Sequence, residues 1–593
     1  MRQYLSKLTF ILTVLLLMMA LSHHTANAAG VVGNGTPTSC TETALRNAIQ
    51  GGGTISFNCG PNNHTITITQ ELYFTGADAT LDGGNKITLK GTPGVHIIRF
   101  QALGAPGEPI VLTLKNLTIR DAFRQGNQRD SNGAAVYATN NIQEYFNLDR
   151  RPTLVVDNVT FTNNVSVQTN TSVAGYDYGG GAIMVWGTNL IVRNSRFFNN
   201  RSEGGGGGGI HVLDGRLTLD NTLFRGNVTT TSSSTNLNSG WGGAFYVDNG
   251  GHTGGRVIIK NTTFENNLAG ARGGVAYIDL YLHLNQSMTI EGSRFIGNRV
   301  ENPRFASAGA IVTNGININQ GGRVDVSIKN SLFQNNVSRG EGNGNGNRGG
   351  EAGALRLSGQ YTTIANTTFI GNRAEGECSN CWNASGGAMF VANTPGPVRI
   401  MNSVFANNYS GWGAAGINAG GGNVIVDNSI FYNNIAFRLG RTNNDAAPWH
   451  CRETMQGGSN NIQFPINDDG PACRPNVMTV NPLLGDLQGL GLTLRPNSPA
   501  IDAGNNAICA AAPVSGLDAN GIARPLGTRC DLGALEFIPN VDTNNDGIVS
   551  PADVISVLNG LGSNAANLDI DGDGNVTGAD ADLVANFIGT TLD

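Results

Sequence analysis

Two acidic loops near the end of the chain carry the residue types best suited to chemistry. They occupy residues 542–553 and 569–580, and both have oxygen-bearing side chains at loop positions 1, 3, 5, 9 and 12 and glycine at position 6. Ca²⁺ takes six to eight oxygen ligands, and this spacing wraps them around one point, with a backbone carbonyl at position 7. We therefore predict Ca²⁺ as the cofactor, with these ligands: Asp542, Asn544, Asp546, Ile548, Ser550 and Asp553 in the first loop, and Asp569, Asp571, Asp573, Asn575, Thr577 and Asp580 in the second.

The sequence after each loop predicts a short helix, at 553–558 and at 580–588. Aspartate rather than glutamate at position 12, and no helix leading into the first loop, make the pair resemble a type I dockerin. That resemblance implies calcium binding and a cohesin-type protein partner. The chain departs from the dockerin pattern at positions 10 and 11, Pro551-Ala552 and Gly578-Ala579, where dockerins carry contacts to the partner. The alternative is that calcium only folds a small C-terminal module.

A repeated unit between residues 112 and 434 must form the body that carries these loops. Phenylalanine is followed three residues later by asparagine in nine copies: Phe161/Asn164, Phe197/Asn200, Phe224/Asn227, Phe264/Asn267, Phe295/Asn298, Phe333/Asn336, Phe369/Asn372, Phe405/Asn408 and Phe431/Asn434. Another asparagine stands three residues before each phenylalanine, except at Gly292. Between most copies lies a Gly-Gly-Ala-apolar segment, as at 180–183 and 242–245. Constant units at variable spacing are typical of a solenoid with variable loops.

Each unit alternates apolar and polar residues, which is the period of a β-strand rather than of a helix. One coil cannot bury its own apolar face, so we expect about ten or eleven stacked coils, with phenylalanine and aliphatic ladders inside a rod on the order of 50 Å long. Asparagine tolerates the left-handed backbone of a sharp corner, and its amide can bond the same amide in the next coil. The sequence thus predicts an all-β, parallel β-helix solenoid.

The alternation of F-x-x-N with G-G-A-[ILV] resembles the repeat pair of the polymorphic outer-membrane proteins, which are β-helical surface proteins and adhesins, and more broadly the pectin-lyase-like superfamily. It covers about half of the chain. The resemblance implies a right-handed β-helix, because handedness itself cannot be read from the residues.

Residues 1–28 have the form of a secretory signal peptide. Arg2 and Lys7 precede an apolar run at 8–21, and Ala26-Asn27-Ala28 is a cleavage signal. A retained membrane anchor is the alternative, and no other apolar run reaches membrane length. A net charge of −6 and a pI near 5.8 give no electrostatic footprint for nucleic acid. We expect an extracellular location, free or associated with the cell surface.

Eight cysteines agree with export. We expect nearest-neighbour disulfides, although spacing does not fix connectivity: Cys40/Cys59, Cys378/Cys381, Cys451/Cys473 and Cys509/Cys530. A zinc site is the alternative for the Cys378-x-x-Cys381 pair.

Both ends of a solenoid need caps. Ser39 and Glu42 fit a capping box that precedes the apolar helical face of Ala44, Leu45, Ala48 and Ile49, which predicts a helix over the N-terminal end. This segment resembles the C-S-L-R-E-A type found ahead of many secreted β-helices.

Past Asn434, residues 498–504 and 531–536 resemble the end of the choice-of-anchor Q domain of secreted or surface β-helix proteins. The acids there either bind a cation or form caps and turns. We therefore expect these parts: 1–28 signal peptide; 29–110 N-terminal cap and first coils; 111–440 repeats; 441–538 C-terminal end of the β-helix; 539–593 dockerin-like module.

No catalytic residue can be assigned from the sequence. Asp468-Asp469 is an acidic pair in an irregular loop, and an active site built from distant coils would not be found in this way. Trp241, Trp382 and Trp412 each precede a Gly-Gly-Ala-like strand, so they either form a stacking platform for sugar rings or pack loops. We predict a calcium-binding β-helix protein that binds polysaccharide or another surface glycan or mediates adhesion. The alternative is a polysaccharide lyase or O-glycoside hydrolase, carried by its dockerin-like module.

Overall fold

The computed structural model of the chain describes residues 30–102, 109–127, 131–140, 151–169, 177–232, 239–249, 255–281, 285–302, 305–316, 322–340, 349–376, 384–420, 423–437, 446–466, 470, 472–474, 476–539, 541, 543–544, 549–565, 567–570, 575–585 and 588. Several predicted features lie outside these residues: the signal peptide, Cys378, Cys381, Trp382, Asp468, Asp469 and the calcium ligands Asp542, Asp546, Ile548, Asp571 and Asp573.

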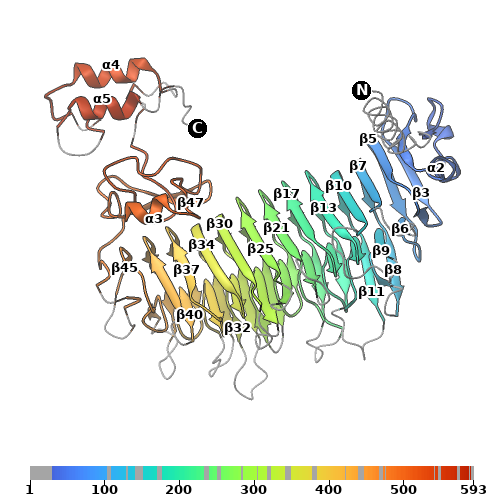
Figure 1. Cartoon of the computed structure of the whole chain (residues 1–593), viewed down its shortest axis with the longest axis horizontal. Coiled ribbons are helices and arrows are strands. Elements are labelled where there is room, and N and C mark those ends of the chain that lie inside the picture. Colours follow the sequence, from blue (N-terminus) through green and yellow to red (C-terminus); the bar gives the residue numbers. More distant parts are fainter. Residues whose placement is uncertain are drawn as a thin grey trace, which may run out of the picture.

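Three long sheets of almost entirely parallel strands run along the molecule, and successive strands of the chain visit them in turn (Figure 1). The first sheet has 21 strands: β1 Gly30–Val32, β2 Gly53–Phe57, β3 His64–Ile68, β5 Ala79–Gly91, β7 Val111–Arg120, β10 Thr153–Thr162, β13 Asn189–Arg193, β14 Arg196–Phe198, β17 Leu217–Asp220, β18 Leu223–Arg225, β21 Arg256–Lys260, β22 Thr263–Glu265, β25 Ser287–Glu291, β26 Arg294–Ile296, β30 Asp325–Gln334, β34 Tyr361–Ile370, β37 Val398–Met401, β38 Val404–Ala406, β41 Val424–Asp427, β42 Ile430–Tyr432 and β45 Ile462–Phe464.

The other two long sheets have 11 strands each among the described residues. The second sheet contains β4 Leu72–Phe74, β6 Ile98–Ala102, β9 Val136–Asn140, β12 Ile183–Trp186, β16 Ile210–Leu213, β20 Phe245–Asp248, β24 Ala276–Tyr281, β29 Ile311–Ile316, β33 Leu355–Ser358, β36 Met389–Ala392 and β40 Ile417–Ala419. The third contains β8 Phe123–Gly126, β11 Val165–Gln168, β15 Arg201–Glu203, β19 Val228–Thr230, β23 Leu268–Ala269, β27 Arg299–Asn302, β31 Val337–Gly340, β35 Arg373–Gly376, β39 Tyr409–Ser410, β43 Ile435–Ala436 and the antiparallel β44 Ala447–Pro448. The chain is therefore a parallel β-helix, as its repeats predict.

The nine phenylalanines of the repeat form one continuous stack inside the rod. All nine side chains have 0% exposure, and neighbouring ring centroids lie between 4.5 and 5.1 Å apart. They share one register position, as between Phe161 and Phe197, because alternate residues of each strand face the core. The stack stabilises every coil, because each aromatic ring buries a large apolar area and offset stacking of neighbouring rings adds further stabilisation.

The asparagines of the repeat divide two tasks that we had expected of one residue. The asparagine three residues after phenylalanine is buried, and its side chain donates to the same side chain of the next coil, as from Asn267 Nδ2 to Asn298 Oδ1 at 2.9 Å. The left-handed backbone instead belongs to its neighbour Asn266, with φ of 54°, and to the asparagine three residues before phenylalanine, such as Asn261 with φ of 47°. Placing the turn on a neighbouring residue leaves each ladder amide free to bond along the rod.

The Gly-Gly-Ala corner has no room for a side chain. Gly242 has a φ of 67°, and a Cβ atom there would lie 1.9 Å from the carbonyl oxygen of Phe245. Gly243 would place a Cβ atom 2.2 Å from the oxygen of Gly274 in the next coil. These contacts explain why the corner is built from the smallest residues.

The N-terminal end is closed by the 3₁₀ helix Pro37–Ser39 and helix α2, Glu42–Ile49, whose Leu45 and Ile49 are buried. The expected capping box is wrong by two residues, because Thr41 is the N-cap and its side chain accepts from the Ala44 N–H. Ser39 is used in the preceding turn, where its hydroxyl donates to the Thr36 carbonyl at 2.6 Å. The Cys40–Cys59 disulfide ties this cap to β2.

Residues 482–537, here called the C-terminal unit, fold back over the outer face of the first sheet at the far end of the rod (Figure 1). The unit contains β46 Leu484–Gln488, β47 Gly491–Leu494 and helix α3 Asn506–Ala510. Its apolar side chains pack on Val404 and Ile430, which point outward from the sheet. Another small pair, β28 Ala306–Ser307 and β32 Gly350–Glu351, lies between the long sheets along the chain.

Two helices follow the predicted calcium loops, α4 at Pro551–Asn559 and α5 at Gly578–Ala585. They pack on each other around a small apolar core that includes Val557 and Val584. Helix α4 begins with a capping box. The Ser550 side chain accepts from the Asp553 backbone N–H, and the Asp553 carboxylate accepts from the Ser550 backbone N–H. Across the described parts of the chain, no helix combines the length and the apolar character needed to cross a membrane.

Candidate functional site

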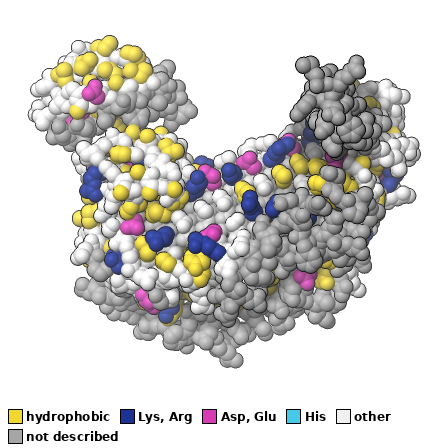
Figure 2. All heavy atoms as spheres, viewed as in Figure 1, with side chains coloured by type: hydrophobic (Ala, Val, Ile, Leu, Met, Phe, Trp, Pro, Cys, Tyr) yellow, Lys and Arg dark blue, Asp and Glu magenta, His cyan; other side chains and the backbone are white. Residues whose placement is uncertain are grey.

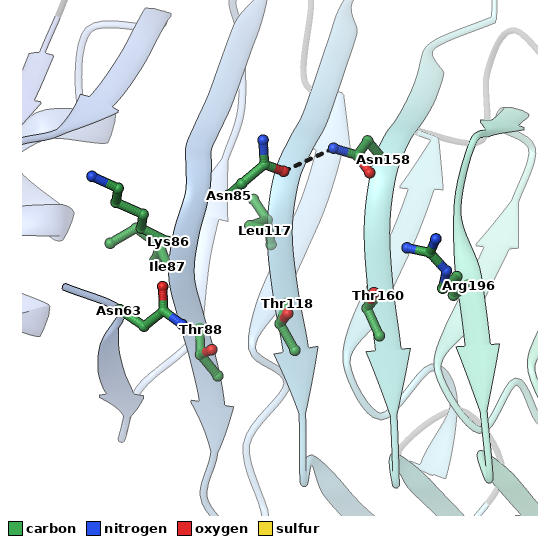
Figure 3. A pocket seen from close by; sticks show the side chains of 10 residues that line it. All are labelled: Asn63, Asn85, Lys86, Ile87, Thr88, Leu117, Thr118, Asn158, Thr160 and Arg196. Carbon is green, nitrogen blue, oxygen red and sulfur yellow. Dashed lines mark hydrogen bonds between the residues drawn. The ribbon is translucent and has the colours of Figure 1, made fainter. Parts of the chain in front are cut away.

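A polar groove of about 160 Å³ lies on the outer face of the first sheet, over the first coils (Figure 3). Its lining comes from β5, β7, β10 and β14 and from the residue before β3. Most of the lining side chains are polar: Asn63, Asn85, Lys86, Thr88, Thr118, Asn158, Thr160 and Arg196. Hydroxyl, carboxamide and cationic groups of this kind can bond the hydroxyl and acidic groups of an extended polar ligand.

The floor of the groove is a row of side chains in register. Thr88, Thr118 and Thr160 are paired on three successive strands, and Arg196 continues the row on β14. The next residues along those strands, such as Ile119 and Phe161, are fully buried, so strand alternation holds the hydroxyls outward. The row therefore repeats at about 4.8 Å along the rod.

The bend of the sheet forms one wall of the groove. Asn158 donates from Nδ2 to Oδ1 of Asn85 at 2.8 Å and to Oδ1 of Asn116 at 2.9 Å. These bonds hold the carboxamides of three coils in one column, as Figure 3 shows for the first pair. The wall is therefore rigid before any ligand binds.

A second row on this face alternates in charge from coil to coil. The residues in register are Asp82, Lys115, Asp157, Arg193, Asp220, Lys260, Glu291 and Lys329. Three contacts along it are Lys115–Asp82 at 3.1 Å, Arg193–Asp157 at 3.0 Å and Lys329–Glu291 at 2.9 Å. Figure 2 shows basic and acidic side chains side by side along this edge. The row is nearly neutral, so it contributes little net field.

The open face ends where the C-terminal unit covers the sheet. The guanidinium of Arg294 donates to the Gly489 carbonyl at 3.2 Å, and Asn366 Nδ2 donates to the Leu517 carbonyl at 2.9 Å. The floor row is interrupted by Leu223 after Arg196 and by Leu332 farther along. It ends with Val404 and Ile430, which pack against the unit. The uninterrupted polar part of this row is thus Thr88, Thr118, Thr160 and Arg196, over the first coils.

A second candidate site lies on the outer face of the second sheet. Asp248 and Asp279 are register partners on adjacent strands, and Tyr246 and Tyr277 are partners two residues earlier. Asn314 follows Asp279 in the next coil. We call these five residues the acidic–aromatic cluster. The carboxylates come from residues that are far apart in the sequence, which is why no motif points to them.

Hydrogen bonds fix the cluster on one side. Asn314 Nδ2 lies 2.6 Å from the Tyr277 hydroxyl and 3.0 Å from Asp279 Oδ1. The guanidinium of Arg356 donates to Asn314 Oδ1 at 3.1 Å and to Glu351 Oε2 at 2.8 Å. This chain of contacts sets the orientation of the Asn314 amide, which then donates to both neighbours.

The surroundings of Asp279 within the acidic–aromatic cluster raise the pKa of its carboxyl group. Burial, together with the neighbouring charge of Asp248, raises the pKa of Asp279 to about 7. Burial likewise raises the pKa of the Tyr277 hydroxyl to about 12. Asp279 therefore keeps its proton at a higher pH than an ordinary aspartate does, and its side chain is buried.

The tryptophan platform that the sequence suggested does not form at Trp241. Its side chain is only 8% exposed, its ring stacks on Tyr277 with centroids 4.4 Å apart, and the Arg272 guanidinium lies 5.2 Å from its centroid. Trp412 is half-buried, and the Arg452 guanidinium lies 5.3 Å from its ring centroid. The indole of Trp241 is therefore used in packing, the alternative reading of these residues.

In both predicted calcium loops the carboxylate at position 12 accepts from the backbone N–H at position 9 and from one N–H near the start of the loop. Asp553 accepts from the Ser550 N–H at 2.9 Å and from the Asn544 N–H at 3.1 Å. Asp580 accepts from the Thr577 N–H at 2.7 Å and from the Ile570 N–H at 2.6 Å. Both carboxylates at loop position 12 are fully buried. Burial acts to raise the pKa of Asp553. The hydrogen bonds from these N–H donors outweigh burial and hold that pKa below its usual range.

The charge of this module fits a bound divalent cation. Residues 539–593 contain nine aspartates and no lysine, arginine or histidine. The predicted ligands that the structure describes, Asn544, Ser550, Asp569, Asn575 and Thr577 with the two position-12 aspartates, all offer oxygen atoms. Among the described residues no group of three histidine, cysteine or acidic side chains stands ready to hold a metal, and both loops are only partly described.

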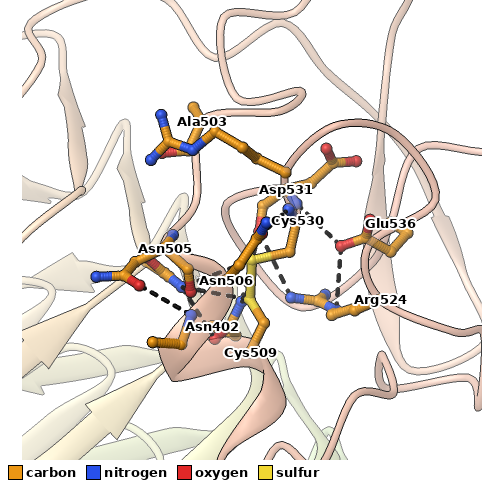
Figure 4. The surroundings of a disulfide bond; sticks show 12 residues. Asn402, Ala503, Asn505, Asn506, Cys509, Arg524, Cys530, Asp531 and Glu536 are labelled. Atoms are coloured by element: carbon orange, nitrogen blue, oxygen red, sulfur yellow. Dashed lines mark hydrogen bonds and ion pairs between the residues drawn. A yellow bond between two sulfur atoms is a disulfide. The ribbon is translucent and has the colours of Figure 1, made fainter.

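The acids of the C-terminal unit form caps and an ion pair (Figure 4). Arg524 lies 3.3 Å from Glu536, both side chains are buried, and the guanidinium also donates to the Gly533 carbonyl at 3.0 Å. The carboxylate of Asp531 accepts from the Asp502 N–H at 2.7 Å. The Cys509–Cys530 disulfide beside them completes the three described disulfides, which join the expected partners.

Comparison with known proteins adds two distant structural likenesses. No protein-family model matches the chain, and no curated protein matches it either. The chain is similar to the crystal structure of the pectate lyase Pel9A, with a TM-score of 0.34, 16% identity, and coverage of 87% of this chain and 98% of the other. It is also similar to the crystal structure of PfbA, a surface adhesin of Streptococcus pneumoniae, with a TM-score of 0.33, 13% identity, and coverage of 71% and 94%. Both likenesses are too distant to carry an argument about activity.

Proposed function

We propose that this is an extracellular β-helix protein that binds polysaccharide along the polar groove. The carrying observation is the row of Thr88, Thr118 and Thr160, which repeats outward-facing hydroxyls along the rod beside a preformed asparagine wall. A polymer of polar units that lies along the rod can bond this row at several coils at once. Three disulfides support an oxidising compartment outside the cell.

Blocking the groove tests this proposal. Thr118→Tyr fills the floor, and Thr263→Tyr is its matched control because Thr263 is a half-buried threonine on β22 in the same row, outside the groove lining. The full chain is passed over immobilised pectins, alginates and xylans. We expect retention on at least one polymer, loss of that retention with Thr118→Tyr, and no change with Thr263→Tyr. Equal retention of all three proteins would place binding elsewhere.

A second candidate function is cleavage of a polysaccharide, as a lyase or O-glycoside hydrolase. It is favoured by one observation, the register pair Asp248 and Asp279 with a pKa of about 7 for Asp279. In such a pair the protonated carboxyl can donate to a leaving group while the other accepts a proton. New reducing or unsaturated ends from the same polymers, abolished by Asp279→Asn, would establish this activity. Retention of the chain on a polymer without any cleavage product would support binding and exclude cleavage of that polymer.

The C-terminal module is proposed to bind two Ca²⁺ ions through its loops. The support is the matched arrangement of Asp553 and Asp580 and the excess of nine aspartates over no basic residue in 539–593. Bound calcium would neutralise the buried carboxylates and hold both loops folded. A cohesin-type partner for this module is a further part of the proposal, and it would be detected as calcium-dependent binding of the full chain to an immobilised cohesin.

A further inference from the structure

The outer face of the third sheet carries two columns of side chains that run along the rod. On β15, for example, Ser202 is buried between Arg201 and Glu203, so these two neighbours point outward. The first column, in register from coil to coil, contains Phe123, Val165, Arg201, Val228, Leu268, Arg299, Val337, Arg373, Tyr409 and Ile435. The second column, two residues later on the strands, contains Gln125, Val167, Glu203, Thr230, Glu301, Arg339 and Glu375. We call these two columns the third-sheet face.

The first column leaves apolar side chains only partly covered on an outer surface. Its aliphatic and aromatic members are all half-buried: Phe123, Val165, Val228, Leu268, Val337, Tyr409 and Ile435. From β8 to β43 the column passes over nine strand spacings, which is about 43 Å. An apolar column of this length that remains in contact with water is typical of an interaction surface.

Most charges of the third-sheet face come in pairs on single strands. Three coils carry an arginine in the first column and a glutamate in the second: Arg201/Glu203 on β15, Arg299/Glu301 on β27 and Arg373/Glu375 on β35. Within each chain the partners are in contact, 2.6 Å apart on β15 and 2.5 Å apart on β35. The side chains of Arg299 and Glu301 are 52% and 41% exposed, so these charges can also reach a second molecule.

We propose that the third-sheet face binds the same face of a second copy of this chain, with the two rods parallel and in register. A two-fold axis that runs along the rods, between the two faces, keeps each coil opposite its equivalent and exchanges the two columns. Arg299 then faces Glu301 of the second copy, and Glu301 faces the arginine in return, with the same exchange on β15 and β35. Between these coils, first-column residues such as Val165 and Val228 are covered by the second copy.

The pattern of charge favours this orientation and this occupant. An antiparallel pair, related by an axis along the strands, would set first column against first column, with arginines opposite arginines or apolar residues. In the parallel pair Arg339, the remaining arginine of the face, lies opposite Val337 of the second copy, so no like charges meet. The face carries four arginines and three glutamates, so it adds little to the repulsion between two chains of net charge −6.

The size of the third-sheet face predicts a weak dimer. A strip about 43 Å long and roughly 12 Å wide covers about 500 Å² on each copy, less than the roughly 800 Å² per partner of a standard stable interface. We therefore expect a dissociation constant on the order of 10 μM. The pair leaves the polar groove uncovered, because the residues that line the groove lie on the first sheet and beside it.

Complementary charge reversals test the proposal, with the dissociation constant measured by sedimentation equilibrium of the full chain. The samples are the wild type, Arg299→Glu, Glu301→Arg, and an equimolar mixture of the two variants. Arg323→Glu is the matched control, because Arg323 and Asp325 form the same kind of exposed pair, two residues apart, on the first sheet. Each single variant should weaken the dimer by about tenfold or more, because like charges then meet at two symmetric positions.

The mixture should recover roughly the wild-type affinity, because two acidic side chains of one variant then face two basic side chains of the other, and the control should behave as the wild type. A chain that stays monomeric at every concentration would overturn the proposal. A dimer that both single variants leave intact would do the same, because it would use another surface. Weakening by both variants without recovery in the mixture would overturn the parallel register and the proposal with it. The substituted side chains are exposed, and unchanged thermal unfolding verifies that each variant folds.

Discussion

Asp279 is a buried acid whose protonation should govern stability between pH 4 and pH 7. Its pKa is raised from 3.8 to about 7 in the folded chain by burial and by Asp248. The folded state therefore binds the proton more tightly than the unfolded chain, and this contribution to stability is complete below about pH 4 and lost as the pH rises through about 7.

Replacing this acid by its neutral isostere tests that linkage. Asp279→Asn should raise the free energy of unfolding at about pH 8 by on the order of 2 kcal/mol and leave it nearly unchanged at about pH 4, because the amide is never charged. Asp325→Asn is a control, since that acid is 56% exposed and paired with Arg323. Denaturant unfolding at several pH values measures the effect. A free energy of unfolding that falls with pH as steeply in Asp279→Asn as in the wild type would contradict it.

The asparagine ladder makes a second prediction for single residues. Asn298 Nδ2 donates to the Phe264 carbonyl at 2.9 Å and to Asn336 Oδ1 at 3.0 Å, and its Oδ1 accepts from the N–H and the side chain of Asn267. Asn298→Ala leaves several of these buried groups unpaired, so we expect a loss of about 2–4 kcal/mol.

The exposed bend asparagine Asn221 gives the control for that variant. Its side chain donates from Nδ2 to Asn194 Oδ1 at 2.9 Å, and Asn221→Gly keeps the backbone conformation at φ of 45°. Its expected cost is below 1 kcal/mol. Hydrogen exchange of the peptides on both sides of each position measures the two losses, and equal losses would show that burial of the ladder is not the cause.

At the scale of the strand and its rung, the phenylalanine stack carries the core of each coil. Phe295 lies 5.0 Å from Phe264 and 4.5 Å from Phe333, centroid to centroid, with no exposure. Phe295→Ala should cost about 3–5 kcal/mol, and Phe295→Leu about 1 kcal/mol, since leucine refills most of the volume. Because each coil contacts only its neighbours, the loss should appear first as faster exchange in β22, β26 and β30 rather than as even loosening of the rod.

The sequence allowed these elements to be predicted because one unit is repeated at every rung. Phe161 and Asn164 recur with fixed spacing, so one strand pattern sufficed for the ladder and the sheets. The N-cap at Thr41 was missed because Ser39 satisfies a capping pattern equally well, and only the preceding 3₁₀ turn decides between them. Local patterns of this kind leave helix ends open by a residue or two.

Neither candidate site on the rod could be read in the same way. Thr88, Thr118 and Thr160 are ordinary strand residues, separated by loops of different lengths, and become one row only through the register. Asp248 and Asp279 are likewise joined by the stacking of two coils. Chemistry assembled across coils has no sequence spacing of its own, in contrast to the predicted calcium loops, where the proposed ligands of each loop lie within twelve consecutive residues.

At the scale of the whole molecule, the C-terminal unit that covers the end of the sheet is built around a buried ion pair. Arg524 and Glu536 are both buried, and Glu536 also accepts from the Asp531 N–H at 2.9 Å. Arg524→Met leaves a buried carboxyl without its cation, and we expect a loss of about 3–5 kcal/mol, with earlier proteolysis between residues 482 and 537. Adding Glu536→Leu should recover part of the loss, because no buried charge then remains.

Calcium should order the end of the chain without changing the rod. In the full chain, hydrogen exchange at α4 and α5 should slow on adding Ca²⁺ and return on adding a chelator, while the coils stay unchanged. Asp542→Ala/Asp569→Ala should abolish the response. Asp582→Ala is the control, because this exposed aspartate of α5 is not a predicted ligand. Exchange that is the same with and without chelator in the wild type would remove calcium from the proposal.

The uneven spacing of the repeats has a consequence for how such a chain can change length. The coil from Leu190 to Arg216 ends where Leu217 takes up the same register position as Leu190, so removing those residues would bring equivalent positions together. The rod could thus grow or shrink by whole turns of about 4.8 Å while its ends stay as they are. Insertion and loss of complete turns would then be a route by which related chains tune the reach of their surface.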